Sequence, residues 1–280
     1  MKLRTIALVA LTLAGCGWKS DGRARLEQEY PTPPPPDAGM SGPIDIGTPM
    51  CSGYQGNWAV QVVQVGTIAP VAEVWTLTIH DLFLADSDGQ TMNLRFCDEA
   101  APIVTPEGPT TLGETKIPDS LKTALHDAPV VLALPTDGSF QAHDVVWLWG
   151  VHNLSQPLTD ALPDAGNWQS DPHVFDQDGD GQPGITMDVL VPMGERYMAR
   201  RSIWQLAPGK LTLDNQWVTG VVTATVEQSV LGASIDLLTA PTPITPKPSG
   251  SVYQLRCVGQ TYTCAALSND YVTLFGDAPQ

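Results

Sequence analysis

The chain has 280 residues, with 14 basic and 30 acidic side chains and a formal net charge of −16. Such an acidic surface repels a phosphate backbone, which argues against nucleic acid as a partner. It also repels anionic lipid head groups, so membrane attachment has to depend on something other than a basic patch.

The first sixteen residues have the pattern of an export signal. Lys2 and Arg4 form a basic start, an apolar run covers residues 6–13, and Leu13-Ala14-Gly15-Cys16 ends it. The run is too short for a membrane-spanning helix, which needs about 20 apolar residues. The segment resembles the lipobox of bacterial lipoproteins. This resemblance implies a signal peptide over residues 1–15 and lipid attachment to Cys16.

The predicted partner of this segment is therefore the membrane, reached through lipid on Cys16. Each buried methylene contributes about 0.8 kcal/mol, and one acyl chain holds only reversibly, so the two or more chains implied by the resemblance give firm attachment. Gly17 follows the cysteine, where some lipoproteins carry an aspartate associated with inner-membrane retention. We therefore expect the cell envelope, at the outer membrane, on either its periplasmic or its surface face. Without its signal the chain has 12 basic and 30 acidic residues and a net charge of −18.

Residues 16–50 are predicted to be the lipidated cysteine and a tether. The segment is polar and has the run Pro31-Thr32-Pro33-Pro34-Pro35-Pro36 at its centre. Proline removes backbone donors and favours the extended polyproline II conformation. The tether holds the folded domain away from the membrane. The alternative is a proline-rich ligand for a partner domain.

Four cysteines remain after Cys16, namely Cys51, Cys97, Cys257 and Cys264. An even set in an exported chain favours disulfides, and four cysteines allow three pairings. We favour Cys51–Cys97 with Cys257–Cys264, because each pair lies at one end of the domain and no cysteine lies between its members. The alternative is four buried thiols.

Residues 51–280 are expected to form one domain, because apolar residues alternate with polar ones at the period of half-buried strands. One short helix is predicted near residues 118–125, after the N-cap signal at Pro118-Asp119-Ser120. The predicted strands cover residues 58–65, 74–84, 91–97, 130–134, 140–151, 184–191, 196–206, 217–228, 251–258 and 271–275. The fold class is mainly β, an antiparallel β-barrel or β-sandwich with one short helix.

Three local features of this pattern are specific enough to test. Alternation in the first strand changes face between Val62 and Val63, as a β-bulge would require. Residues 74–97 are predicted to form one hairpin and residues 130–151 a second. Between residues 153 and 183 the chain is predicted to be a loop rich in aspartate.

Within this loop, Asp176, Asp178 and Asp180 stand at alternate positions and are followed by Gly181 and Gln182. Alternate aspartates in a curled loop direct hard carboxylate oxygens at one point, and glycine permits the sharp turn. The motif resembles the first half of an EF-hand loop and the aspartate-rich repeats of thrombospondin type 3. The resemblance implies a structural calcium ion, with the Gln182 carbonyl as a further ligand.

The motif departs from an EF-hand at its end. The twelfth position is Met187, where an EF-hand has a bidentate glutamate, and Asp188 replaces that ligand only if the chain rearranges locally. The flanking residues also have loop and strand patterns and not helical ones. The alternative is an acidic surface turn that holds no ion.

No catalytic motif is found, so we expect a non-enzymatic binding or structural protein of the cell envelope. The five histidines match no metal-binding pattern. Gly56-Asn57-Trp58 is similar to the G-x-W opening of lipocalins, and this resemblance implies the alternative function, a carrier of an apolar ligand. A secreted hydrolase is the third possibility, because glycoside hydrolysis requires only two well-placed carboxylates.

Overall fold

The structure is a computed structural model that describes residues 46–47, 51–68, 74–105, 107–110, 115–135, 139–190, 192–211 and 216–276. The predicted signal peptide, Cys16 and all of the tether except residues 46–47 lie outside these ranges. Residues Ile44–Gln280 form a compact unit. Among the described residues, no helix has both the length and the apolar character needed to cross a membrane.

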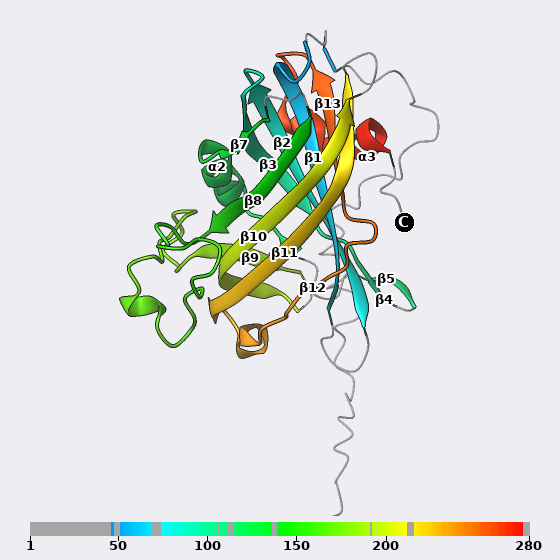
Figure 1. Ribbon diagram of the computed structural model, residues 1–280. Coiled ribbons are helices and arrows are strands. Elements are labelled where there is room, and N and C mark those ends of the chain that lie inside the picture. Colours follow the sequence, from blue (N-terminus) through cyan, green and yellow to red (C-terminus); the bar gives the residue numbers. More distant parts are fainter. Residues whose placement is uncertain are drawn as a thin grey trace, which may run out of the picture. The chain divides into compact units, whose positions relative to one another are not determined.

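The described residues form one antiparallel sheet of thirteen strands, with two α-helices and two 3₁₀-helices (Figure 1). The strands are β1 (Gly56–Ile68), β2 (Trp75–Ser87), β3 (Thr91–Ala100), β4 (Ile103–Thr105), β5 (Gly108–Thr110), β6 (Thr115–Lys116), β7 (Val130–Ala133), β8 (Phe140–Trp149), β9 (Ile185–Val189), β10 (Gly194–Leu211), β11 (Trp217–Ala233), β12 (Thr245–Pro246) and β13 (Val252–Val258). The helices are α2 (Asp119–Asp127), η1 (Trp168–Ser170), η2 (Asp236–Thr239) and α3 (Cys264–Phe275).

The sheet is organised around β1. Strand β2 pairs with its whole length, and β13 pairs with its first half, over Asn57–Val63. Beyond β13 the sheet continues through β11, β10 and β9, while β3 and β7 extend it on the other side of β2. The sheet curls into a half-barrel, which confirms the mainly β, antiparallel class and selects the barrel-like form over two packed sheets.

Aromatic side chains fill the inner face of the curl at the end where β13 pairs with β1 and β11. Phe83, Phe96, Trp147 and Trp204 are buried there, and the ring centroids of Phe83 lie 5.2–5.8 Å from those of the other three. Tilted and edge-to-face pairs at this spacing are the favoured geometry for aromatic rings. Trp58 of the G-x-W element is also fully buried in this core.

Strand β1 is buried on both faces, because α3 covers part of the outside of the sheet. Ala59 and Leu82 on the outer face pack with Leu267 and Leu274 of the helix. Val63 is fully buried as well, and the register with β2 and β13 runs through it without a shift. The predicted bulge is therefore wrong. Apolar residues at consecutive positions reflect burial on two faces and not a change of face.

The predicted short helix is confirmed as α2, but the predicted strand at residues 271–275 is wrong, because these residues end α3. The Thr263 side chain caps this helix by accepting a hydrogen bond from the Ala266 N–H at 3.2 Å. Leu267 and Leu274, seven residues apart on one helical face, are buried. A run of five residues, 271–275, is too short to distinguish the period of a strand from the period of a helix.

The predicted hairpin over residues 74–97 is confirmed as β2 and β3. The second predicted hairpin is wrong, although both of its strands exist. Strand β7 pairs with β3 and β8 pairs with β10, so the two strands end opposite sides of the curled sheet. Adjacent strands in the sequence thus belong to different edges.

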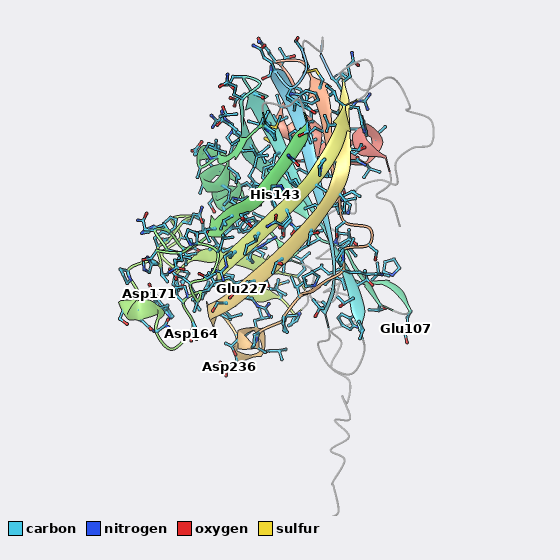
Figure 2. All side chains as sticks on the ribbon, viewed as in Figure 1. Glu107, His143, Asp164, Asp171, Glu227 and Asp236 are labelled. Atoms are coloured by element: carbon cyan, nitrogen blue, oxygen red, sulfur yellow. A yellow bond between two sulfur atoms is a disulfide. The ribbon has the colours of Figure 1, made fainter. Side chains whose placement is uncertain are left out.

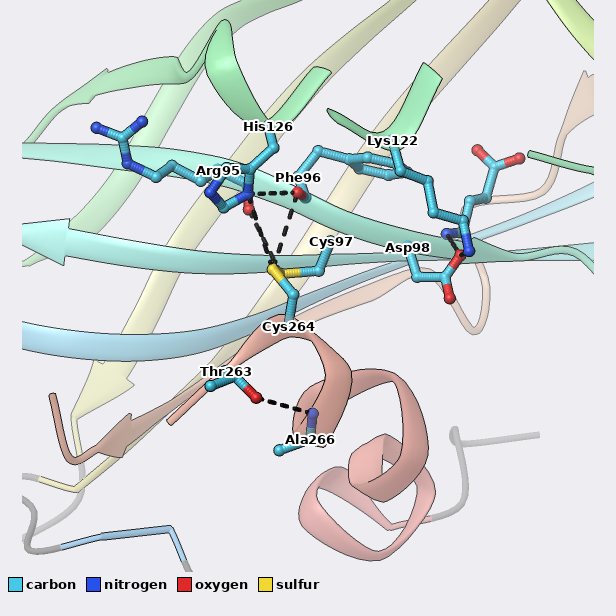
Figure 3. The surroundings of a disulfide bond; sticks show 10 residues. Arg95, Phe96, Cys97, Asp98, Lys122, His126, Thr263, Cys264 and Ala266 are labelled. Atoms are coloured by element: carbon cyan, nitrogen blue, oxygen red, sulfur yellow. Dashed lines mark hydrogen bonds and ion pairs between the residues drawn. A yellow bond between two sulfur atoms is a disulfide. The ribbon is translucent and has the colours of Figure 1, made fainter. Parts of the chain in front are cut away.

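The four cysteines form two disulfides, as predicted, but the favoured pairing is wrong. Cys51 bonds Cys257 and Cys97 bonds Cys264, with Cα–Cα distances of 6.1 and 5.0 Å. The reason lies in the sheet, which pairs Trp58 with Cys257 and so brings the two ends of the domain together. Figure 3 shows the second disulfide, which ties β3 to the start of α3 beside α2.

Candidate functional site

A cavity of about 270 Å³ lies inside the curl, below the aromatic core. Its walls are mainly aliphatic side chains from both halves of the sheet. They include Leu77 and Ile79 of β2, and Ile185, Met187 and Val189 of β9. These residues alternate along their strands with polar neighbours, so the period-two pattern itself produces the apolar wall. Cavities of this character are typical binding sites for small apolar molecules.

A buried polar layer separates the cavity from the aromatic core. Gln64 of β1, Asp81 of β2, Glu99 of β3 and Arg200 of β10 each contribute a side chain from a different strand. Gln64 donates a hydrogen bond to Asp81, and Arg200 Nη1 donates to Glu99 Oε2 at 2.6 Å. Glu99 and Arg200 belong to the cavity lining.

The Arg200 guanidinium is held rigidly but is only partly satisfied. The residue is 1% exposed, and its guanidinium lies over the Trp149 ring, 4.3 Å from the centroid. Its Nε and Nη2 atoms are buried and have no hydrogen-bond partner among the described residues. Such unsatisfied donors are costly in a protein interior and mark a place where a further acceptor is favoured.

Asp81 and Glu99 face each other in this layer, and two carboxyl groups can hydrogen-bond only by sharing a proton. Burial and the Glu99 charge raise the pKa of Asp81 well above its usual value, and Arg200 opposes this shift only in part. The layer thus combines an Arg200–Glu99 ion pair with an Asp81 carboxyl whose protonated form is favoured by burial.

The open end of the cavity has an apolar rim at η2. Leu237 belongs to the cavity lining and is nevertheless 71% exposed. Arg196 fixes this segment to β10 by donating hydrogen bonds to the Leu238 and Ala240 carbonyls at 3.0 and 3.4 Å. Figure 2 shows Asp236, an exposed residue of η2, on this part of the molecule.

The aspartate loop is the second candidate site. Carboxylate oxygens of Asp176, Asp178 and Asp180 lie within 4.8 Å of one another, and this is the kind of oxygen cluster that hard cations bind. Asp176 accepts backbone N–H groups of Gly179 and Gly181 at 2.7 and 2.8 Å, which curls the loop. Thr186 of β9 fixes it to the sheet, because its backbone N–H donates to Asp178.

Within this cluster, the pKa of Asp178 is raised well above its usual value. Burial, with the Asp180 charge adding to it, raises the pKa of Asp178 to about 6 even though the Thr186 N–H opposes the shift. The Oδ1 atom of Asp178 is buried and has no partner among the described residues. A buried, unsatisfied carboxylate oxygen facing two other carboxylates fits the requirements of a divalent cation.

Of the other two predicted ligands, Asp188 lies apart from this cluster and Gln182 lies beside it. Asp188 is outside the group of three and sits on β9 opposite Glu195 and Lys116. Gln182 adjoins the cluster, and its backbone N–H donates to Asp180 at 2.8 Å. A second potential metal group, Cys97, His126 and Cys264, is occupied by its own disulfide, and His126 Nδ1 lies 2.9 Å from the Phe96 carbonyl oxygen (Figure 3).

The polar layer was missed from the sequence, although its signal is there. Asp81 interrupts an apolar strand face between Ile79 and Phe83, and Arg200 and Ser202 interrupt another between Met198 and Trp204. Gln64 was hidden by the bulge prediction, since that prediction moved it to the outer face. A polar residue at an inward position of an alternating strand is thus the informative signal.

No protein-family model matches this chain, and comparisons with the curated proteins and with the solved structures also gave no match.

Proposed function

We propose that this protein is a lipid-anchored, exported carrier or sensor that binds a small apolar molecule in the cavity of its half-barrel. The observation that carries the proposal is the cavity itself, which has aliphatic walls and an apolar rim at Leu237. An exported binding protein was the leading prediction from the sequence, and the cavity favours the carrier among its alternatives.

The proposal includes the lipid on Cys16 and the tether, which rest on the lipobox pattern alone. It also includes a structural calcium ion at Asp176, Asp178 and Asp180, supported by the mutual distances of their oxygens. The loop leads directly into β9, whose residues Ile185 and Met187 line the cavity. An ion there would stabilise one wall of the cavity.

A hydrolase is less well supported. Asp81 and Glu99 are neighbouring carboxyl groups, but Asp81 has no exposed surface and the Glu99 carboxylate is engaged by Arg200. Attack on a substrate requires carboxyl groups that a substrate and a water molecule can reach.

The test is binding of the neutral fluorescent probe N-phenyl-1-naphthylamine to the purified protein. We expect saturable fluorescence enhancement, and we expect Met187→Trp, which fills the cavity, to reduce it severalfold. Val221→Trp is the matched control, because Val221 is 54% exposed on β11 and lies outside the cavity lining. Absence of saturable binding, or equal binding by the two variants, contradicts the proposal.

A further inference from the structure

The Arg200 guanidinium presents one complete, unused edge to the interior. Nη1 is engaged by Glu99 at 2.6 Å, whereas Nε and Nη2 have no partner among the described residues. In a planar guanidinium these two nitrogens share an edge and direct their N–H bonds in parallel. An oxygen acceptor placed at this edge can accept both N–H bonds. A hydrogen-bond donor or an alkyl group there would leave both N–H bonds unsatisfied.

The charge of the site restricts what that acceptor can be. The Arg200 cation is already balanced by Glu99, and burial together with the Glu99 charge raises the pKa of the neighbouring Asp81. An added carboxylate or phosphate would leave an unbalanced negative charge in a desolvated layer, which is strongly unfavourable. A neutral carbonyl oxygen satisfies the same two donors without adding charge.

Arg196 does not change this balance. It is four residues from Arg200 along β10, which corresponds to about 13 Å, and it lies nearer the rim. Its side chain is partly exposed, and it donates to two backbone carbonyls of the segment that includes η2. An anionic group held at Arg196 would be at the entrance, too far away to satisfy Arg200.

We infer that the cavity selects a neutral acyl compound, an alkyl chain ending in an ester or amide, whose carbonyl oxygen accepts from Arg200 Nε and Nη2. The alkyl chain occupies the aliphatic walls between the polar layer and the rim. The inference rests on the proposed function, since it requires that the cavity be the ligand site.

The test compares octane, methyl octanoate and octanoate as competitors of N-phenyl-1-naphthylamine at neutral pH. The test variant is Arg200→Met combined with Glu99→Gln, which removes the ion pair without leaving a single buried charge. Its matched control is Arg201→Met combined with Glu227→Gln, the neighbouring ion pair, which is outside the cavity lining. The affinity of each ligand is compared between native and variant protein, so the free energy of transferring that ligand out of water is the same in both and cancels.

We expect the test variant to bind methyl octanoate roughly tenfold more weakly than native protein does, which is the effect of losing one hydrogen bond to a charged group. The affinity for octane should be unchanged. The control variant should change neither, and octanoate should bind the native protein more weakly than the ester. If the test variant does not fold, carbon-13-edited infrared spectra decide. The ester carbonyl band of bound, labelled methyl octanoate should lie at lower frequency than in hexane.

Three results would overturn the inference. In the first, octanoate binds more tightly than methyl octanoate, and Arg196→Gln abolishes octanoate binding. The ligand would then be an anion whose charged head group lies at the rim, beside Arg196. Methyl octanoate could be unaffected by the test variant, with ordered water alone satisfying Arg200. The carbonyl band could be unshifted. In each case binding of octane keeps the proposed function intact, whereas failure of all ligands and of the probe refutes the proposed function instead.

Discussion

Asp81 is the residue at which folding and protonation are most closely linked. Because burial and Glu99 raise its pKa, the folded state binds its proton more tightly than the unfolded state does. The stabilisation is fully present below the unfolded pKa of about 3.9 and is lost as pH rises through the folded value.

We therefore predict that Asp81→Asn, which keeps the shape and removes the titration, makes the protein less sensitive to rising pH. The measurement is the melting temperature of native and variant protein between pH 4 and pH 9. As pH increases, the melting temperature of the variant should rise relative to that of native protein. Exposed Asp236→Asn is the control and should run parallel to native protein. If Asp81→Asn also runs parallel, Asp81 does not carry the proton.

Asp178 provides the residue-scale test of the calcium proposal. Without the expected bidentate glutamate, affinity should be near the 10⁻⁴–10⁻³ M range of extracellular modules, and ten times that dissociation constant adds about 1.4 kcal/mol of stability. We predict that calcium raises the melting temperature and that chelator lowers it. Magnesium should substitute poorly, because it prefers strict octahedral geometry.

The variants at this site should respond in order. Asp178→Asn should weaken the calcium response and Asp178→Ala should abolish it. Asp171→Asn, in the same loop but outside the cluster of three, should leave it unchanged. If millimolar calcium changes neither the melting curve of the native protein nor the heat measured in a calorimetric titration, the loop is only an acidic turn.

At the scale of elements, the Cys97–Cys264 bond joins β3 to α3 across 167 residues of sequence. The chain-entropy relation gives about 5 kcal/mol for a loop of this length, and removal of native disulfides costs about 2–5 kcal/mol. We predict a loss in this range for Cys97→Ser combined with Cys264→Ser, measured by urea unfolding. Peptide mapping of unreduced protein should return Cys51–Cys257 and Cys97–Cys264. Recovery of Cys51 joined to Cys97 would contradict the fold.

Alternation predicted the strands well, because most of them have one face toward the core and one toward solvent. Strand β11 is the clearest case, with Val218, Val222 and Val226 buried and the intervening Thr223 and Thr225 exposed. The same rule failed for the outer face of β1, where Val63 is fully buried and Ala59 packs with residues of α3. Local periodicity cannot report a cover that comes from 200 residues further along the chain.

Pairing could not be predicted from the sequence, since alternation is the same whichever neighbour a strand has. The β7–β8 hairpin and the disulfide pairing both failed through the assumption that near neighbours in sequence are neighbours in space. The candidate site was predicted only in part for the same reason. The aspartate cluster is local and was visible, whereas Gln64, Asp81, Glu99 and Arg200 meet only when four strands are in register.

At the scale of the whole molecule, attachment to the membrane depends on Cys16. We predict that Cys16→Ala either releases the protein from membranes or leaves it unprocessed, while native protein partitions into detergent. Intact mass is the decisive measurement, since lipidation adds acyl mass to a chain that begins at Cys16. A mature chain that begins there without added mass would refute the anchor and leave the cavity proposal untouched.

The pairing of β1 with β13 has a consequence for how the molecule is made. The Cys51–Cys257 bond joins residues 206 apart, and the β1–β13 pairing joins Asn57 to Val258, 201 residues apart, so neither can form while the last strand is still being synthesised. Contacts this distant in sequence also slow folding. The pairing at the centre of the sheet and both disulfides are therefore all in place only after the chain has been completed as far as the start of α3.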